Sequence, residues 1–301
     1  MKNQDANNHC LAELSAASKR FGKIVALDSL DLEVRPGELL AVLGQNGAGK
    51  TTAISLLLGL EQPDSGSARL FGHSPHLIEG RRHIGVMMQE VFLAAELRVR
   101  EHIDLVASYY PNALSAQCVM QSTHTESLAD RPYGKLSGGQ KRQAQFAMAI
   151  CGRPKLLFLD EPTVGLDIQS REVMWAALRR LVDEGSSIVL TTHYMEEAEA
   201  LADRVVVLAK GRVIASGTVQ QIRALVVRKR VTCVTSLDLR QIAAWPDVES
   251  VTREQQRLLI ATSNPEVVVR RLLAADENLC ELEIRRAGLA EAFTELTQEA
   301  A

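Results

Sequence analysis

The sequence predicts an α/β protein with a buried parallel sheet and a small α+β appendage, on three observations. The apolar run 39–43 leads directly into the glycine-rich stretch 44–52 and then into an apolar helical pattern over 53–60, which is the order of an α/β unit. The apolar runs 84–88, 156–159 and 187–191 have the length of strands that are covered on both faces. The composition changes after residue 226, and no glycine occurs between Gly217 and Gly288. We therefore expect two domains, 9–226 and 227–301.

The remaining elements are expected in chain order. Residues 9–36 form a β-rich prelude with a strand over 30–34, and a short strand over 68–71 follows a turn at 63–66. The segment 94–135 lacks strand-like alternation and is expected to be mostly helical. Helices are expected over 171–184, 196–203 and about 217–227, with a hairpin over 205–215. The tail is expected as strand 230–235, helix 238–244, strands 249–254 and 257–262, helix 265–275, strand 280–285 and helix 289–297, a ferredoxin-like order.

Composition and charge exclude several classes of function. The net charge of −3, without a block of like charges, argues against binding to nucleic acid or to an anionic membrane. No apolar stretch approaches the roughly 20 residues of a membrane helix, and the start of the chain lacks a signal peptide core. The five cysteines are scattered and form no C-x-x-C pair, so we expect neither disulfides nor zinc. We expect a cytosolic chain that would act on any membrane from outside the bilayer.

The stretch 44–52 predicts a phosphate-binding loop. It fits the pattern G-x-x-x-x-G-K-[ST] between a strand and a helix, in which backbone N–H groups and a helix N-terminus cradle an anion. An ordinary glycine turn is the alternative, and the flanking strand and helix argue against it. We therefore expect a nucleoside triphosphate to bind at Gly44, Gln45, Asn46, Gly47, Ala48, Gly49, Lys50, Thr51 and Thr52.

Polar residues follow three of the apolar strands. Asp160 and Glu161 end the run 156–159, and two carboxylates at the end of a core strand suit a divalent metal and a water nucleophile. Gln89 follows the strand 84–88, and His193 follows the strand 187–191. The carboxyl edge of a parallel sheet is where such folds bind ligands. A capped strand-end acid and a surface histidine are the alternatives for Glu161 and His193.

A second candidate anion site precedes the helical run 141–150. It is formed by Leu136, Ser137, Gly138, Gly139 and Gln140. A serine and two glycines at a helix start can bind an anion by the same dipole argument. Ser137 is equally compatible with a simple helix N-cap. If the anion site is real, a dimer could close each nucleotide between the loop of one copy and this helix of the other.

Together these motifs resemble the ATP-binding cassette family. In chain order they resemble its Walker A (44–52), Q-loop (Gln89), signature (136–140), Walker B (156–161), D-loop (Gly165, Leu166, Asp167) and H-loop (His193). The stretches 191–199 and 289–297 are similar to the drug- and antibiotic-exporter branch. The resemblance implies a P-loop NTPase cassette with a RecA-like core, an antiparallel β subdomain and a helical subdomain at about 94–150.

The resemblance also implies a role for each motif residue. Phe21 would stack on adenine, and Lys50 would hold the phosphates. Thr51 and Asp160 would hold Mg²⁺, and Gln89 would sense the metal and the γ-phosphate. Glu161 would act as general base and His193 would contact the γ-phosphate. Ser137 and Gly139 would bind the γ-phosphate of ATP held by the opposite subunit.

Two departures from the family pattern stand out. Arg98 occupies a position where the family often has a threonine that caps a helix together with the glutamate at Glu101, so the start of this helix is expected to be looser or re-routed. The stretch 111–130 is also unusual, because its parts 112–117 and 121–125 are polar, uncharged and weak in helix propensity where relatives carry charged helix-forming sequence. We expect this segment to adapt the chain to a particular permease.

The leading hypothesis is therefore the ATPase subunit of an exporter of a drug, antibiotic, lipid or other small molecule. It would act as a homodimer at the cytoplasmic face of a prokaryotic membrane, with a permease that is a separate chain. An importer ATPase is the first alternative. A soluble cassette acting on DNA or the ribosome is the second, and the chain has no room for the long coiled coils or second cassette of such proteins. The cargo would be selected by the permease.

Overall fold

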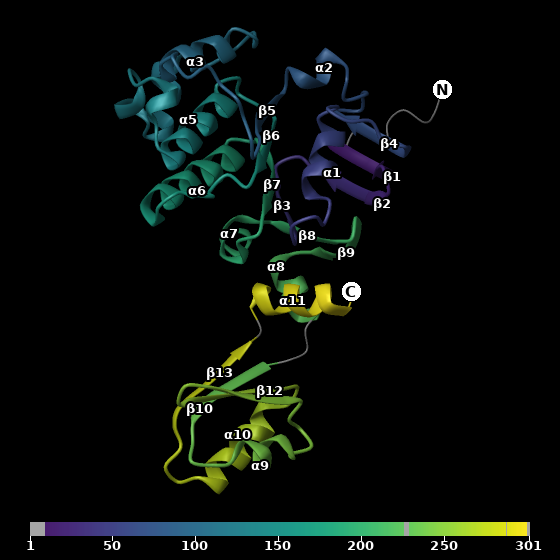
Figure 1. Ribbon diagram of the computed structural model, residues 1–301, viewed down its shortest axis with the longest axis vertical. Coiled ribbons are helices and arrows are strands. Elements are labelled where there is room, and N and C mark those ends of the chain that lie inside the picture. Colours follow the sequence, from purple (N-terminus) through teal and green to yellow (C-terminus); the bar gives the residue numbers. More distant parts are fainter. Residues whose placement is uncertain (1–9, 226–228, 287, 300–301) are drawn as a thin grey trace. The chain divides into compact units, whose positions relative to one another are not determined.

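The computed structural model describes residues 10–225, 229–286 and 288–299 (Figure 1). The chain forms two compact units, Met1–Val219 and Gln220–Ala301. The domain boundary that the sequence predicts, between residues 226 and 227, lies outside the described residues, as does the end of the helix expected to reach 227.

A six-stranded sheet forms the centre of the larger unit. All the neighbouring strands are parallel except the final pair, which is an antiparallel hairpin turned at Lys210 and Gly211. The order is β5(Ile84–Met87), β6(Leu156–Asp160), β7(Ser187–Thr192), β3(Leu39–Gly44), β8(Arg204–Ala209) and β9(Arg212–Gly217). The apolar runs that predicted buried strands are all confirmed.

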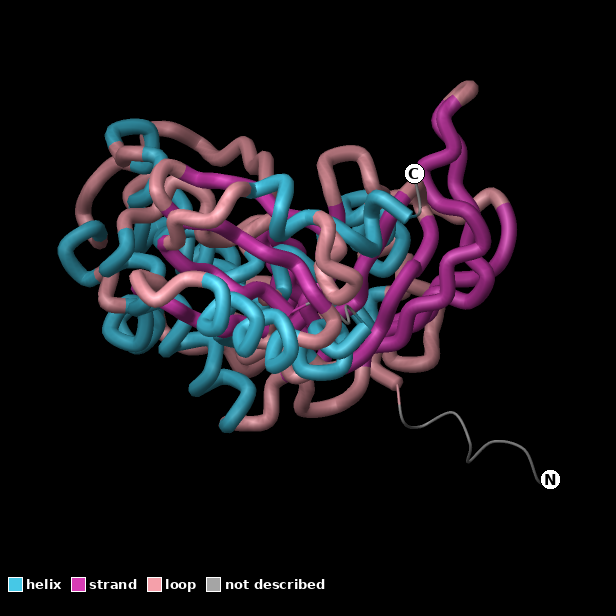
Figure 2. Tube along the Cα trace, turned by 90° about the horizontal axis from the view of Figure 1, so that it is seen from below, coloured by secondary structure: helices cyan, strands magenta, loops and turns pink. Residues whose placement is uncertain are grey.

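The two faces of this sheet contribute to two different apolar cores, because neighbouring residues of a strand point to opposite faces. Leu39 packs into a core with α5(Gly138–Ile150), α6(Ile168–Asp183) and α7(Met195–Leu201). Leu40 packs instead against α1(Lys50–Leu57) and a three-stranded antiparallel sheet. That sheet has the order β2(Ile24–Val34), β1(Ala12–Phe21) and β4(Ser65–Leu70). Helices consequently flank the central strands on both faces, and Figure 1 shows α6 and α1 on opposite sides of them. Figure 2 shows the helices and strands of the chain from below.

Several element boundaries differ from those expected. Helix α1 begins at Lys50, three residues before the apolar pattern, because the loop residue Gly49 already serves as its N-cap. Strand β4 begins at Ser65, inside the expected turn, because it pairs with β1 from that residue onward. A short helix, α2(Ile78–Arg81), precedes β5 and was not expected.

The segment expected to be mostly helical is confirmed as such. It contains α3(Val99–Ala107), α4(Ala116–Thr123) and two 3₁₀ turns at Glu126–Leu128 and Tyr133–Lys135, and α5 follows it. Helix α4 has an uncharged sequence, but Ser115 caps it and Val119 and Met120 are buried in the core. Packing therefore stabilises a helix that propensity alone would not.

The start of α3 is re-routed rather than loose. The Arg98 N–H group donates to the Glu101 carboxylate at 2.7 Å, so half of a capping box is present. A guanidinium has no acceptor for the other half, and that of Arg98 pairs with Asp130 at 3.3 Å. The Val99 N–H group donates to the Arg131 carbonyl at 3.1 Å. Backbone carbonyl groups of the segment 129–131, which precedes α5, thus cap the start of α3 in place of a side chain.

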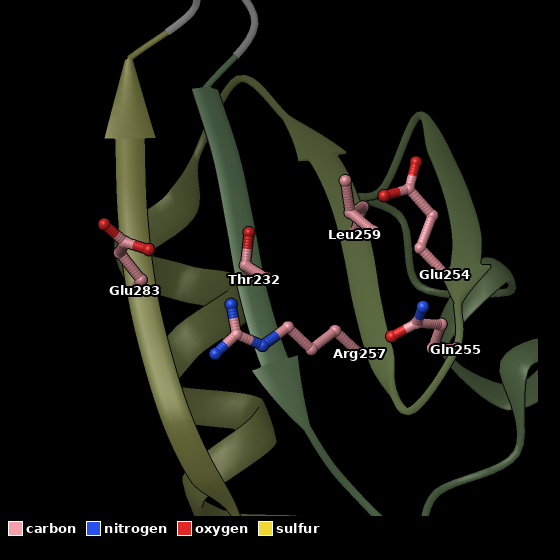
Figure 3. A pocket seen from close by; sticks show the side chains of 6 residues that line it. All are labelled: Thr232, Glu254, Gln255, Arg257, Leu259 and Glu283. Carbon is pink, nitrogen blue, oxygen red and sulfur yellow. The ribbon is translucent and has the colours of Figure 1, made fainter.

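The smaller unit contains a four-stranded antiparallel sheet in the order β11(Ser250–Glu254), β12(Arg257–Thr262), β10(Lys229–Val234) and β13(Cys280–Arg286). Its helices are α9(Leu239–Ala243), α10(Pro265–Ala275) and α11(Leu289–Glu299), and α8(Val219–Leu225) precedes the sheet. Val231 and Ile260 are buried beneath α9 and α10. Figure 3 shows the opposite face, where Thr232, Leu259 and Glu283 point away from the helices. The order of strands and helices is the one that the sequence predicts.

Within the described ranges, no helix combines the length and the apolar character that crossing a bilayer requires.

Candidate nucleotide-binding site

The loop between β3 and α1 has the backbone of a phosphate cradle. Gly49 has a φ of 104°, a conformation that other residues rarely adopt. A Cβ atom at Gly49 would lie 2.6 Å from the carbonyl oxygen of Ala26, so the position is closed to any side chain. The Ala48 N–H group donates to the Gln45 carbonyl at 3.0 Å and closes the curl of the loop. The loop can therefore present N–H groups at the N-terminus of α1 to an anion.

The ammonium group of Lys50 lies inside this curl. Lys50 is 6% exposed, and its Nζ atom donates to the carbonyl oxygens of Gly44 at 2.7 Å and Gln45 at 3.2 Å. Burial lowers the pKa of this ammonium, and the charges of Glu161 and Asp160 oppose that shift. The cation is thus held in place by neutral acceptors, next to the position where the loop would hold phosphate oxygens.

Three elements bring oxygen ligands together at the end of β6. The Thr51 hydroxyl, from α1, donates to Asp160 Oδ2 at 3.1 Å. The Thr191 hydroxyl, from β7, donates to the other oxygen of the same carboxylate. Asp160 is buried and pairs in register with Thr191 in the parallel sheet. Hydroxyl and carboxylate oxygens are the ligands that Mg²⁺ prefers, so these residues fit a magnesium ion.

Glu161 and His193 meet at the same edge of the sheet. The Glu161 carboxylate lies 3.1 Å from Nδ1 of His193, and the glutamate side chain is only 10% exposed. Glu161 has a φ of 50°, in the left-handed region, and its N–H group donates to the Thr191 carbonyl at 3.0 Å. A backbone strained in this way costs about 1–3 kcal/mol and concentrates at functional sites. His193 itself is 42% exposed, so it is a surface histidine that contacts the buried Glu161 carboxylate.

One cavity of about 470 Å³ is lined by two of the strand-end residues and by six of the nine predicted loop residues, namely Asn46, Gly47, Gly49, Lys50, Thr51 and Thr52. Gln89 lies beyond the end of β5 and faces this cavity together with Glu161. Phe21, which the sequence predicts to stack on a base, is 47% exposed and does not line the cavity. The apolar lining comes from Ile24 and Ala26 of β2, which the sequence analysis missed. The base-stacking role of Phe21 stays a prediction.

The predicted signature residues begin helix α5, outside that cavity. The Ser137 hydroxyl accepts from the Gln140 N–H group at 3.3 Å, and the Gln140 side chain accepts from the Ser137 N–H group at 3.1 Å. Ser137 is thus the N-cap of a complete capping box, as one of the two interpretations of the sequence expected. The capping interaction uses the N–H group of Gln140 and leaves those of Gly138 and Gly139 available to an anion.

The predicted D-loop lies against the signature stretch. A Cβ atom on Gly139 would lie 3.0 Å from the Gly165 carbonyl oxygen, so any larger residue would make a tight contact with the D-loop. Asp167 ends the D-loop and caps α6 by accepting from the Ser170 N–H group at 2.7 Å. Hydrogen bonds from Ser170 hold the pKa of the Asp167 carboxyl below its usual value. Two motifs that are remote in the sequence therefore form one surface.

Comparison with known proteins decides the family. Residues 27–164 match the family model described as ABC transporter. The chain is 41% identical over 212 residues to the Nod factor export ATP-binding protein I of Burkholderia thailandensis, covering 68% of this chain and 70% of that protein. The chain belongs to the ABC transporter family. It is 38% identical over 213 residues to human ATP-binding cassette sub-family A member 2, which covers 68% of this chain and 9% of that protein.

Solved structures confirm the fold of this cassette. The ATP-binding subunit of an ABC transporter is 28% identical, covers 71% of this chain and 92% of its own, and has a TM-score of 0.66. A dimeric bacterial ABC transporter cassette is 25% identical, covers 69% of this chain and 98% of its own, and has a TM-score of 0.63. The predicted α/β P-loop cassette and its ATPase class are confirmed, and ATP is the nucleotide of the family.

Three polar residues of the cassette escaped the sequence analysis. Thr191 could have been noticed as a hydroxyl at the end of an otherwise apolar strand. Glu197 is fully buried on α7, where its Oε1 atom accepts from Trp175 Nε1 at 3.2 Å, and burial raises the pKa of its carboxyl. The sequence did contain a signal for Glu197. It lies four residues before the apolar Leu201, and residues at this spacing share one face of a helix. Arg142, in the second turn of α5, is buried as well, and the sequence alone offered no signal for it.

Proposed function

We propose that this cassette is the ATP-hydrolysing subunit of an exporter whose membrane-spanning permease is a separate polypeptide. The observation that carries the ATPase chemistry is the meeting of Glu161 and His193 beside the Thr51–Asp160 pair, at the mouth of the phosphate loop. The direction of transport rests on the relatives named as Nod factor export ATP-binding proteins. The cassette is assigned to 9–226 and the appendage to 227–301.

The residues of the loop bind and orient the nucleotide. Lys50 exchanges its carbonyl acceptors for oxygens of the β- and γ-phosphates, because a charged acceptor forms the stronger hydrogen bond. The N–H groups of 44–52 surround the same phosphates. Phe21 stacks on the adenine from the end of β1, while Ile24 and Ala26 form the apolar wall beside it.

Mg²⁺, held by Thr51 and Asp160 with Gln89 nearby, would neutralise charge on the phosphates. Thr191 orients Asp160 by donating to the oxygen that Thr51 does not use. Gln89 would contact the metal and the γ-phosphate, since it lines the same cavity as the loop. Thr51, Asp160 and Gln89 fit Mg²⁺ because all three side chains offer oxygen atoms as ligands.

Glu161 accepts a proton from the attacking water as general base. Its burial and its left-handed backbone hold the carboxylate at the end of β6. His193 orients this carboxylate through Nδ1 and contacts the γ-phosphate with its exposed side. Catalysis then consists of positioning and electrostatic stabilisation of a transferring phosphoryl group.

A second copy of the chain completes the site. Ser137 and Gly139 of one protomer bind the γ-phosphate of ATP held by the loop of the other. The solved dimer of a related cassette supports this arrangement. Both the loop and the signature stretch are intact here, which favours a homodimer with two working sites.

The permease contacts the helical subdomain. Phe92, three residues after Gln89, is 96% exposed and offers an apolar side chain to a partner. On α4, Gln117 and Gln121 are exposed one helical turn apart and the C-cap residue His124 is exposed as well, while the opposite side of the helix is buried. This uncharged polar stripe is the part of 111–130 that adapts to one permease.

Affinity purification of the chain from its native membranes, with partners identified by mass spectrometry, tests the proposal. We expect a stoichiometric polytopic membrane protein, and the cargo would then be sought through that permease. Recovery of ribosomes or a soluble partner without a permease would contradict the transport role but not the ATPase chemistry. The variant Q117E/Q121K, altered only at exposed positions, should keep ATPase activity and lose permease binding, while substitution of the exposed Arg100 by methionine should keep both.

A further inference from the structure

Arg142 of α5 is buried at the junction of two nucleotide-sensing motifs. Its Nη1 atom donates to the carbonyl oxygen of Met88 at 3.0 Å and to Gln145 Oε1 at 3.3 Å. Met88 immediately precedes Gln89, and Arg142 lies two residues after the signature stretch 136–140. Arg142 is only 8% exposed. One guanidinium thus binds the backbone of the Q-loop from the signature helix.

The contact continues to the segment that precedes the signature. Gln145 donates through Nε2 to the Tyr133 hydroxyl at 2.7 Å, in the buried interior. Tyr133 is itself buried, and its carbonyl oxygen accepts from the Leu136 N–H group at 3.2 Å. An unbroken series of hydrogen bonds, Met88–Arg142–Gln145–Tyr133–Leu136, therefore connects the residue before Gln89 with the residue before Ser137.

The charge of Arg142 lacks the partner expected for a buried cation. Among the residues that the structure describes, no carboxylate lies within 4.0 Å of its guanidinium, and its hydrogen-bond acceptors are neutral. Burying an unpaired guanidinium is costly, and a neutral side chain of the same volume would pack without that cost. Burial lowers the pKa of Arg142, while the charges of Asp160 and Glu161 favour its charged form. Stability of the fold alone does not account for an arginine here.

We propose that Arg142 is a positioning residue that couples the γ-phosphate contact of Gln89 to the orientation of the signature stretch. The inference rests on the proposed roles of Gln89 and Ser137. When ATP and its metal pull Gln89 toward the cavity, the Met88 carbonyl moves with it, and the rigid fork of Arg142 transmits the shift to α5 and Tyr133. Hydrogen-bond networks of this kind can carry coupling between two sites, and this series connects the backbone at Gln89 with the backbone at Ser137.

The test compares two variants. R142M removes the N–H donors at similar side-chain volume, whereas R142K keeps the positive charge and a single donor nitrogen. R100M is the matched control, because Arg100 lies in the same subdomain and its exposed guanidinium pairs with the exposed Asp130. Y133F removes the acceptor at the other end of the series and leaves the Met88 contact intact. Each full-length variant is measured for affinity toward a fluorescent ATP analogue, for kcat, and for ATP-dependent dimerisation in the E161Q background.

We expect R142M to change nucleotide affinity less than about twofold and to lower kcat and the dimer association constant about tenfold each, the size of one lost charged hydrogen bond. Y133F should show the same pattern with a smaller loss, R142K should recover at least half of kcat, and R100M should match the wild type. Equal dimerisation and kcat in R142M and R100M would overturn the inference. So would a loss of nucleotide affinity in proportion to kcat, which indicates a merely structural role.

The outcome separates this inference from the proposed dimer. If E161Q alone fails to dimerise with ATP, the homodimer is contradicted, and hydrogen exchange of 133–140 with and without Mg-ATP decides the coupling. Protection of that segment by nucleotide in E161Q but not in E161Q/R142M supports the role of Arg142. Identical protection in both contradicts it.

Discussion

The Glu161 carboxylate approaches Nδ1 of His193 to 3.1 Å, although the two residues follow different strands of the central sheet. Strands β6 and β7 are adjacent and parallel, so residues just beyond their ends meet at one edge. The pair lies beside the phosphate loop and places a candidate base and its orienting partner in one site.

Substitution E161Q should abolish ATP turnover while preserving ATP binding. The amide keeps the size and one acceptor of the carboxylate but cannot take a proton, and the loss of a general base costs about 10²–10⁴-fold in rate. Steady-state phosphate release and equilibrium nucleotide binding measure the two effects. Turnover close to that of the wild type would remove Glu161 from the mechanism.

Substitution K50A should act on nucleotide binding itself. It removes the buried ammonium group that the loop holds through Gly44 and Gln45, and a charged hydrogen bond to phosphate contributes about 1.5–3 kcal/mol, or roughly 10- to 150-fold in Kd. Calorimetric titration with Mg-ATP checks this. An unchanged Kd combined with lost turnover would assign Lys50 to catalysis alone.

Substitution G49A should destabilise the cassette more than G47A. Both glycines have positive φ, which costs an alanine about 1–2 kcal/mol. Only at Gly49 would the new Cβ atom also meet a backbone oxygen, that of Ala26, at 2.6 Å, whereas the space around Gly47 is open. Thermal unfolding of both variants measures the difference. Equal Tm values would show that the loop relaxes away from β2 without cost.

Substitution E197Q should stabilise the cassette increasingly as pH rises. Burial raises the pKa of Glu197 above its usual value near 4.5, so the unfolded chain loses this proton at lower pH than the folded chain does. Stability that is present at low pH is therefore lost as pH rises toward the folded-state pKa. An amide does not titrate, and its oxygen can still accept from Trp175.

The gain in Tm of E197Q over the wild type should consequently be larger at pH 8 than at pH 5. E196Q is the control, because Glu196 is the exposed neighbour on the same helix. A gain that does not depend on pH would show that the proton of Glu197 is not linked to folding.

Much of the fold followed from local pattern. The runs 39–43, 84–88, 156–159 and 187–191 are apolar throughout because both faces of a central parallel sheet are covered, and all four are strands. The phosphate loop 44–52 was predictable because its pattern depends only on glycines and a lysine at fixed spacing within nine consecutive residues. The tail alternated strand and helix patterns clearly enough for its seven elements to match the structure within one or two residues.

Contacts between distant segments depended on the tertiary structure. Parallel register places Asp160 beside Thr191, and packing of α1 brings Thr51 to the same carboxylate. The bond from Arg142 to Met88 joins residues 54 positions apart. Local periodicity reports only which face of an element is buried, whereas these partners are set by how elements pack. Hence the sequence identified the side chains of the nucleotide site, whereas strand register and helix packing decided which of them contact one another.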